Sequence, residues 1–326
     1  MRPLFTWAVI VFIAVMAGPR QGCALLFTGQ ISSWNSLENT GTGKRVYEFG
    51  TRFIPELAHD LYGNADLRLD LQISANAFWF YSHTGHETNA KFYRCWFRFA
   101  THKFESRIGL QKINFGPARL LRSLMWFDQL DPRDPLKLTD GVYGLRLRYD
   151  FENLSSIWLW GLWGENATKG LELVSTRKGT PECGGRLQIP LGRGEVAVTG
   201  HYRITNPNVT AGNQFPDSHV PETRIAMDGI WDVGVGLWFE SALMYADYRG
   251  DLLDWQSFFT LGSDYTFPLA NGIYVLAEHM IYSLGNRPFA REQCYHLSGG
   301  MLSCPKTWVD EASLHSAYNA ETPRVA

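Results

Sequence analysis

Two segments on either side of a long loop alternate strictly between apolar and polar residues, and this alternation constrains the fold more than any other feature. The segments cover residues 104–116 and 143–150. Successive side chains of a β-strand point to opposite faces, so the apolar residues of each segment share one face. The polar faces carry Glu105, Arg107, Gln111, Arg146, Arg148 and Asp150. A soluble sheet covers its apolar face with a second layer, whereas lipid would cover it in a membrane barrel with an arginine-lined interior.

The same alternation recurs along most of the chain, with turn residues between the segments. Strands are predicted at residues 25–34, 45–54, 64–80, 91–101, 104–115, 141–151, 155–163, 183–190, 194–204, 222–231, 233–248, 255–267 and 271–283. A soluble antiparallel sheet with one wet face alternates as well. However, few covering helices are expected, and hydrocarbon admits only helices or closed barrels. The predicted fold class is therefore all-β, an antiparallel transmembrane β-barrel of about 14–16 strands.

The two ends of the chain differ from the rest. Residues 1–24 resemble a secretory signal peptide, with an apolar run from Leu4 to Ala17 and small residues before a cleavage point after Ala24. Residues 25–301 are predicted to form the barrel. Residues 302–326 are an atypical carboxyl-terminal tail, which neither alternates nor ends on an aromatic residue. Two alternatives remain open: a complete barrel with a polar tail, or a chain that lacks its last strands.

Composition excludes several classes of protein. The longest apolar runs are too short for a transmembrane helix. The 31 glycines and 12 tryptophans are typical of barrel turns and interfacial aromatic girdles. The net charge of −2 becomes −4 when Arg2 and Arg20 leave with the signal, so no nucleic-acid partner is expected.

The sequence also offers no clear catalytic or metal site. His83, His86 and Glu87 lack the spacing of a helical zinc motif, and no Gly-x-Ser-x-Gly elbow occurs. We therefore predict a protein that is not an enzyme, with no cofactor and no metal. Cys294 and Cys304 could pair in an oxidising periplasm or remain free.

The loop between the two opening strands, residues 114–140, is predicted to be functional because long loops without regular structure usually are. Asp131-Pro and Asp134-Pro end its helical first half. In one interpretation the loop folds into the lumen and narrows it, which would also cover Trp126 and Phe127. Asp128, Asp131 and Asp134 would then face Arg107, Arg146 and Arg148. In the alternative, the aspartates set turns and the loop lies on the surface.

Residues 107–135 resemble a known group of proteins. The pattern Arg107-x-Gly-x-Gln-x-Ile-x-Phe-Gly116, then Trp126-Phe-Asp and Asp131-Pro-x-Asp-Pro135, is similar to porin-like bacterial outer-membrane β-barrels, among them alginate-export-like and related uncharacterised porins. The resemblance is specific over residues 104–151 and general over residues 25–285. It implies an outer-membrane channel or exporter with arginine-rich walls, and it does not identify the solute.

We therefore expect a porin-like channel of the bacterial outer membrane for passive diffusion of small anionic or polyhydroxylated solutes. The alternative is a barrel that binds, exports or assembles surface polysaccharide without general conductance, with Trp158, Trp160 and Trp163 stacking on sugars. Its expected partners are outer-membrane lipid, hydrophilic solutes or glycans, and the barrel-assembly machinery. Glu240, Glu278 and His279 lie in otherwise apolar strands and are expected to point into the lumen. The predicted pore-lining residues are Arg68, Arg94, Arg98, Arg107, Gln111, Asp128, Asp131, Asp134, Arg146 and Arg148.

Overall fold

The computed structural model describes twelve stretches of the 326-residue chain. These are residues 4–15, 25–39, 45–64, 66–82, 85–128, 138–164, 167–207, 219–248, 254–268, 272–290, 293–307 and 310–321.

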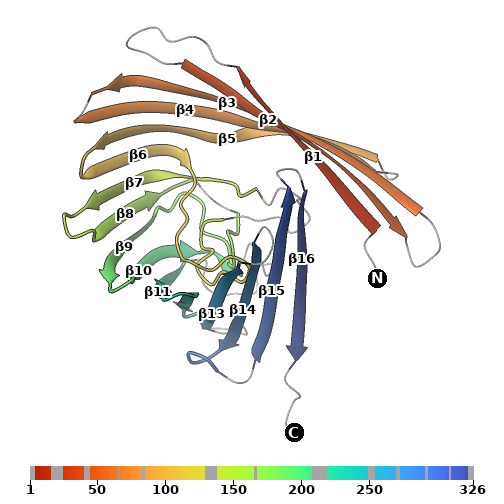
Figure 1. Ribbon diagram of the computed structural model, residues 1–326. Coiled ribbons are helices and arrows are strands. Elements are labelled where there is room, and N and C mark those ends of the chain that lie inside the picture. Colours follow the sequence, from red (N-terminus) through yellow and green to blue (C-terminus); the bar gives the residue numbers. More distant parts are fainter. Residues whose placement is uncertain are drawn as a thin grey trace. The chain divides into compact units, whose positions relative to one another are not determined.

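Sixteen β-strands follow one another in these stretches and form one sheet in chain order (Figure 1). Neighbouring strands pair antiparallel, as expected when short turns connect consecutive strands. The strands are β1 (Leu4–Val15), β2 (Leu25–Asn39), β3 (Arg45–Gly63), β4 (Leu67–Ser82), β5 (Gly85–Thr101), β6 (Phe104–Gln111), β7 (Val142–Asp150), β8 (Ser156–Leu162), β9 (Glu182–Leu191), β10 (Gly194–Thr205), β11 (Val220–Asp232), β12 (Gly236–Ala246), β13 (Trp255–Phe267), β14 (Ile273–Gly285), β15 (Gln293–Thr307) and β16 (Asp310–Glu321).

Burial along the strands is the reverse of that in a soluble sheet, and β11 shows this most clearly. Arg224 and Asp228 are only 0% and 4% exposed. Their apolar neighbours Ile225 and Met227 are 58% and 47% exposed. Because successive residues alternate in side, the charged residues share one covered face, called here the polar face, and the apolar residues share an open one, called the apolar face. This is the pattern of a strand whose apolar face meets lipid.

Short turns join the strands where the sequence supplies the required residues. Between β11 and β12, Gly234 has a φ of 94°, a value that glycine adopts without a steric cost. Its N–H donates to Asp232 Oδ1 at 3.1 Å, a local side-chain bond that favours a turn over strand continuation.

The strands predicted from sequence correspond to β2–β14, with differences at their ends. β3 runs to Gly63 rather than residue 54, β5 begins at Gly85 rather than residue 91, and β6 ends at Gln111 rather than residue 115. Among the described residues, no helix is both long enough and apolar enough to span a bilayer.

The two ends of the chain also contain strands. β15 and β16 extend through Thr307 and over Asp310–Glu321, so the secondary structure differs from the non-strand tail expected for residues 302–326. At the other end, Leu4–Val15 pairs with β2 as β1, and its assignment as part of an export signal remains a prediction.

The two cysteines that were expected either to pair or to remain free both lie in β15. Cys304 is ten residues further along this strand than Cys294. At roughly 3.3 Å per residue, their Cα atoms are about 33 Å apart. A disulfide requires Cα atoms within about 7 Å, so these two cysteines cannot pair with each other within one chain.

The chain divides into two compact units. Unit 1 comprises residues 1–113 and 128–147, and unit 2 comprises residues 114–127 and 148–326. Residues 114–127, in the first half of the loop that joins β6 to β7, therefore belong with the later strands.

Candidate functional site

The first half of the β6–β7 loop lies in unit 2, on the polar face of β12, where Glu240 holds it. Glu240 is 0% exposed and accepts the N–H of Ala118 at 2.9 Å and of Leu124 at 3.0 Å. At Gly116, φ is 89° and a Cβ would lie 2.3 Å from Glu240 Oε1. Glycine is therefore required here both for the backbone conformation and for the close approach of the carboxylate.

A second buried carboxylate, Glu278 of β14, holds the adjacent part of the loop. It accepts the N–H groups of residues 119–121 at 2.6–2.8 Å, and the Trp238 indole N–H at 3.0 Å. Consecutive N–H groups that converge on one anion form a concave nest and replace the water lost on burial. Thr260 of β13 adds a bond from its hydroxyl to the Leu121 carbonyl at 2.7 Å. The loop is thus bonded to three consecutive strands.

An aromatic cluster fills the space between this loop and the polar face of β8 and β10. Phe115 stacks on Trp160 with ring centroids 5.7 Å apart, and Phe127 meets His201 edge-on at 5.1 Å. Trp126 and Phe127 are 1% and 3% exposed, so the loop covers them. Offset and edge-on ring contacts of this kind add to the hydrophobic gain from burial.

A second connection, between β8 and β9, also reaches the polar face within unit 2. Its residues Lys169–Thr176, called here the inner segment, pack over β9, β10 and β11 and take part in a cluster of charged side chains. The cluster contains three cations and three carboxylates, each at most 9% exposed: Lys169, Arg203, Arg224, Glu172, Glu182 and Glu222. Buried charges persist when they are paired and hydrogen-bonded in this way.

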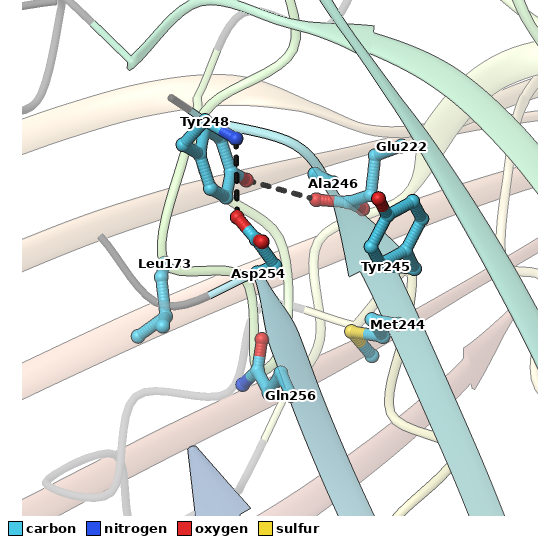
Figure 2. Close-up of a pocket in the computed structure, with 8 residues that line it drawn as sticks. All are labelled: Leu173, Glu222, Met244, Tyr245, Ala246, Tyr248, Asp254 and Gln256. Atoms are coloured by element: carbon cyan, nitrogen blue, oxygen red, sulfur yellow. Dashed lines mark hydrogen bonds between the residues drawn. The ribbon is translucent and has the colours of Figure 1, made fainter. Parts of the chain in front are cut away.

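A small cavity lies next to this cluster, where the inner segment meets the ends of β12 and β13 (Figure 2). Its volume of about 20 Å³ suffices for about one water molecule. Tyr248 donates its hydroxyl to Glu222 at 3.4 Å and its N–H to Asp254 at 3.3 Å, as Figure 2 shows. Burial raises the pKa of Tyr248, so this side chain is a neutral donor. The cavity is too small to hold a solute.

Five of the predicted arginines lie in unit 1. Four of these five are called here the arginine wall: Arg94, Arg98, Arg107 and Arg146. The strand registers bring two of them together, because Arg98 of β5 lies opposite Arg107 of β6. Arg98 also lies opposite Asp70 of β4. Arg98 Nε donates to Asp70 at 2.7 Å. Glu105 is the shared carboxylate, with Arg107 at 3.3 Å, Arg98 at 3.7 Å and Arg146 in direct contact.

Aromatic rings and backbone carbonyls complete the arginine wall. The Arg107 guanidinium lies 4.3 Å from the ring centroid of Trp96, a distance at which a cation and an aromatic face attract each other. Arg94 is buried, 4.0 Å from the Tyr93 ring, and donates to the Thr139 carbonyl at 2.9 Å.

The remaining predicted pore-lining residues have varied positions. Arg68 is exposed, and Arg148, in unit 2, pairs with Asp150 at 2.8 Å. Gln111 is 0% exposed, and its side-chain amide donates to the backbone carbonyls of Gly144, at 2.9 Å, and of Arg107. These bonds join the β6 and β7 backbones, so the role of Gln111 is structural. Asp128 is 2% exposed. Two loop aspartates, Asp131 and Asp134, lie outside the described residues.

Sequence reasoning identified Glu240 and Glu278 only as lumen-facing charges and missed that they anchor the loop. Both do lie on the polar face. The same expectation for His279 is wrong, because adjacent strand residues point to opposite faces. His279 is exposed beside Ser298, with its Nδ1 2.8 Å from the serine hydroxyl. Within the described stretches, no group of three or more histidine, cysteine or acidic residues is arranged to hold a metal ion.

Comparison with known proteins shows which solved structures share this fold. No family model matches the chain, and no curated protein matches it in sequence. Among solved structures, OmpF of Salmonella typhi in complex with daunomycin aligns with a TM-score of 0.59 and 10% identity, over 93% of this chain and 91% of its own. An anion-selective porin from Comamonas acidovorans aligns with a TM-score of 0.54 and 11% identity, over 97% of this chain and 90% of its own.

A third structure, the trimer form of the outer-membrane protein OmpT of Vibrio cholerae, aligns with a TM-score of 0.53 and 10% identity, over 96% of this chain and 88% of its own. At such low identities the likeness concerns the fold and not the activity. The narrower resemblance to alginate-export-like barrels is not shown by these comparisons and remains a prediction. The architecture of the chain is that of the antiparallel porin β-barrel.

Proposed function

We propose that this chain is a channel of the bacterial outer membrane through which small hydrophilic solutes diffuse passively. The observation that carries the proposal is the combination of an open apolar face with a polar face onto which a loop is anchored. An apolar face of this kind fits the lipid of the outer membrane. A loop bonded to the polar face by Glu240 and Glu278 narrows the interior of a barrel and gives the channel its constriction. Export by a signal peptide and insertion by the barrel-assembly machinery are part of this proposal.

We further propose that the channel prefers anions. In the arginine wall, the guanidinium groups of Arg98, Arg107 and Arg146 gather around Asp70 and Glu105, and we infer from this concentration of guanidinium groups that the wall carries positive charge. Surplus charge on a low-dielectric wall raises the local concentration of the opposite ion. Polyhydroxylated solutes would pass by hydrogen bonding to the same polar groups.

The polysaccharide-binding alternative receives less support from the tryptophans expected to stack on sugars. Trp160 is 4% exposed and packs beneath Phe115, so its ring is not accessible to a glycan. Trp163, which directly follows β8, is 48% exposed. The Arg148 guanidinium lies 5.2 Å from the ring centroid of Trp158. These rings do not form a continuous stacking surface, and passive conduction is the function we favour.

Reversal potentials in planar bilayers under a KCl gradient test the proposal. The wild-type protein is expected to conduct, with a chloride-to-potassium permeability ratio above unity. Replacing both Arg107 and Arg146 by alanine should lower that ratio by about twofold or more, because the variant loses two wall charges. Arg193→Ala is the matched control, since this arginine is exposed in the β9–β10 turn and should leave the ratio unchanged.

Two results would count against the proposal, and they differ in meaning. An absence of conductance from correctly folded protein, combined with glycan binding, would favour the polysaccharide function. A cation preference that the double arginine variant leaves unaltered would retain the channel and reject its anion selectivity.

A further inference from the structure

The inner segment, Lys169–Thr176, is fixed to the polar face by its backbone as well as by its charges. Thr176 forms an isolated antiparallel bridge with Thr205 at the end of β10. On either side of this bridge, Arg177 N–H donates to the Ile204 carbonyl at 2.8 Å, and Asn206 N–H donates to the Ser175 carbonyl at 3.1 Å. The segment thus continues the sheet pattern for a few residues instead of extending away from it as a solvated loop.

The charged cluster links the inner segment to three strands. Lys169 Nζ lies 2.6 Å from Glu182 of β9. Glu172 accepts Arg203 of β10 at 2.9 Å and Arg224 of β11 at 2.7 Å.

Both arginines also bind Glu222 of β11, Arg203 at 2.6 Å and Arg224 at 2.7 Å. Three positive and three negative side chains therefore neutralise one another, and Glu172 and Lys169 are the members that the inner segment contributes.

Neutral contacts complete the attachment. Val174 is 2% exposed and packs with Val220, Ala246 and Tyr248 in a small apolar core. The Leu171 carbonyl accepts the Gln256 amide of β13 at 2.9 Å. A segment held by ion pairs, backbone bonds and a small core has one defined position.

We propose that the inner segment is a second constriction element, separate from the β6–β7 loop, and that it determines which wall charges a solute meets. This inference rests on the proposed channel function. By covering Arg203 and Arg224, the segment removes two cations from the polar face that solutes contact, and by its own volume it narrows the barrel interior. Releasing it should widen the path and expose those two arginines.

Glu172→Gln tests the proposal because it keeps the side-chain volume but removes the carboxylate that binds both arginines. Single-channel conductance in planar bilayers is expected to rise by about 1.5-fold or more, and the chloride-to-potassium permeability ratio is expected to rise with it. A second variant replaces residues 167–178 by a short glycine-serine linker and should produce a larger increase. Heat-modifiable gel migration establishes that each variant has folded.

A disulfide separates the effect of position from that of charge. In the Glu172→Gln background, cysteines at positions 176 and 205 replace the bridged threonines and refasten the segment when oxidised. Oxidation should return the conductance towards the wild-type value, and reduction should raise it again. Cysteines in the wild-type background are the matched control and should give no redox dependence.

The outcomes distinguish this inference from the proposed function. If the wild-type protein does not conduct, the channel function fails and the inference fails with it. If the wild type conducts while the folded Glu172→Gln and linker variants keep its conductance and selectivity, the channel stands and the inner segment is not a constriction. A redox-independent increase in the cysteine variant would also overturn the inference, because it would assign the effect to charge alone.

Discussion

At the residue scale, Gly116 illustrates how the loop position depends on a missing side chain. Its φ of 89° is disfavoured for any residue with a Cβ, and the Glu240 carboxylate occupies the space that a Cβ would take. The carboxylate in turn needs that proximity, because it binds two N–H groups that follow the glycine, at Ala118 and Leu124. The glycine and the glutamate, 124 residues apart, therefore specify one geometry together.

Gly116→Ala should destabilise the protein by more than backbone strain alone. Gly234→Ala is the matched control, since Gly234 has a similar φ of 94° but no described neighbour lies within 4 Å of the place that its Cβ would take. Strain at Gly234 should cost about 1–3 kcal/mol of unfolding free energy, and the clash with Glu240 should add about 1–3 kcal/mol at Gly116. Urea unfolding followed by tryptophan fluorescence measures both. Equal losses in the two variants would mean that Glu240 does not lie against the glycine.

At the element scale, the polar faces of β9, β10 and β11 are joined by a charge pair that spans the three strands. Arg186 of β9 binds Asp228 of β11 through two bonds, at 2.5 and 2.8 Å, and also donates to Thr199 of β10 at 3.0 Å. Both charged side chains are about 95% buried. A buried pair of this kind is costly to break because one charge is left without its partner.

Asp228→Asn should therefore lower the unfolding free energy by about 3–5 kcal/mol, since it leaves the Arg186 guanidinium buried opposite a neutral amide. The double variant with Arg186→Met and Asp228→Leu removes both charges and should lie within about 1–2 kcal/mol of the wild type. A double-mutant cycle built from urea unfolding curves of Arg186→Met, Asp228→Leu and the double variant measures the coupling. If the losses of the two single variants add up to the loss of the double variant, the two side chains do not interact.

The strands could largely be predicted from the sequence, whereas the contacts that position the loops could not. Alternation is a local property, so β2–β14 follow from neighbouring residues with errors only at their ends. The anchoring of the β6–β7 loop joins residues 116 to 159 positions apart, and no local pattern records it. Residues 164–182 lie between two predicted strands, and Lys169 and Glu172 are residue types that are common in solvated segments. Their burial depends on Arg203 and Arg224, which follow much later in the chain.

At the scale of the whole molecule, the apolar face defines the environment of the barrel. Large apolar side chains are exposed along most described strands, among them Phe53, Trp79, Ile108, Leu159, Val198, Ile225 and Leu261. In water, molecules with such a surface would associate with one another nonspecifically. In a bilayer, the same surface contacts the hydrocarbon chains of the lipid. The depth at which each of these residues lies should therefore determine how well it tolerates a charge.

Ile225→Arg places a charge in the middle of β11, on the apolar face, and should lower the unfolding free energy in lipid vesicles by about 2–4 kcal/mol. Leu191→Arg is the matched control, because Leu191 is 54% exposed, against 58% for Ile225, but ends β9 at its turn. Near the interface the cost should fall to about 0–1 kcal/mol, since the guanidinium reaches the headgroups. Urea unfolding of vesicle-inserted protein measures both values. Two equally small losses would show that the apolar face does not meet hydrocarbon, because an exposed surface in water tolerates either arginine.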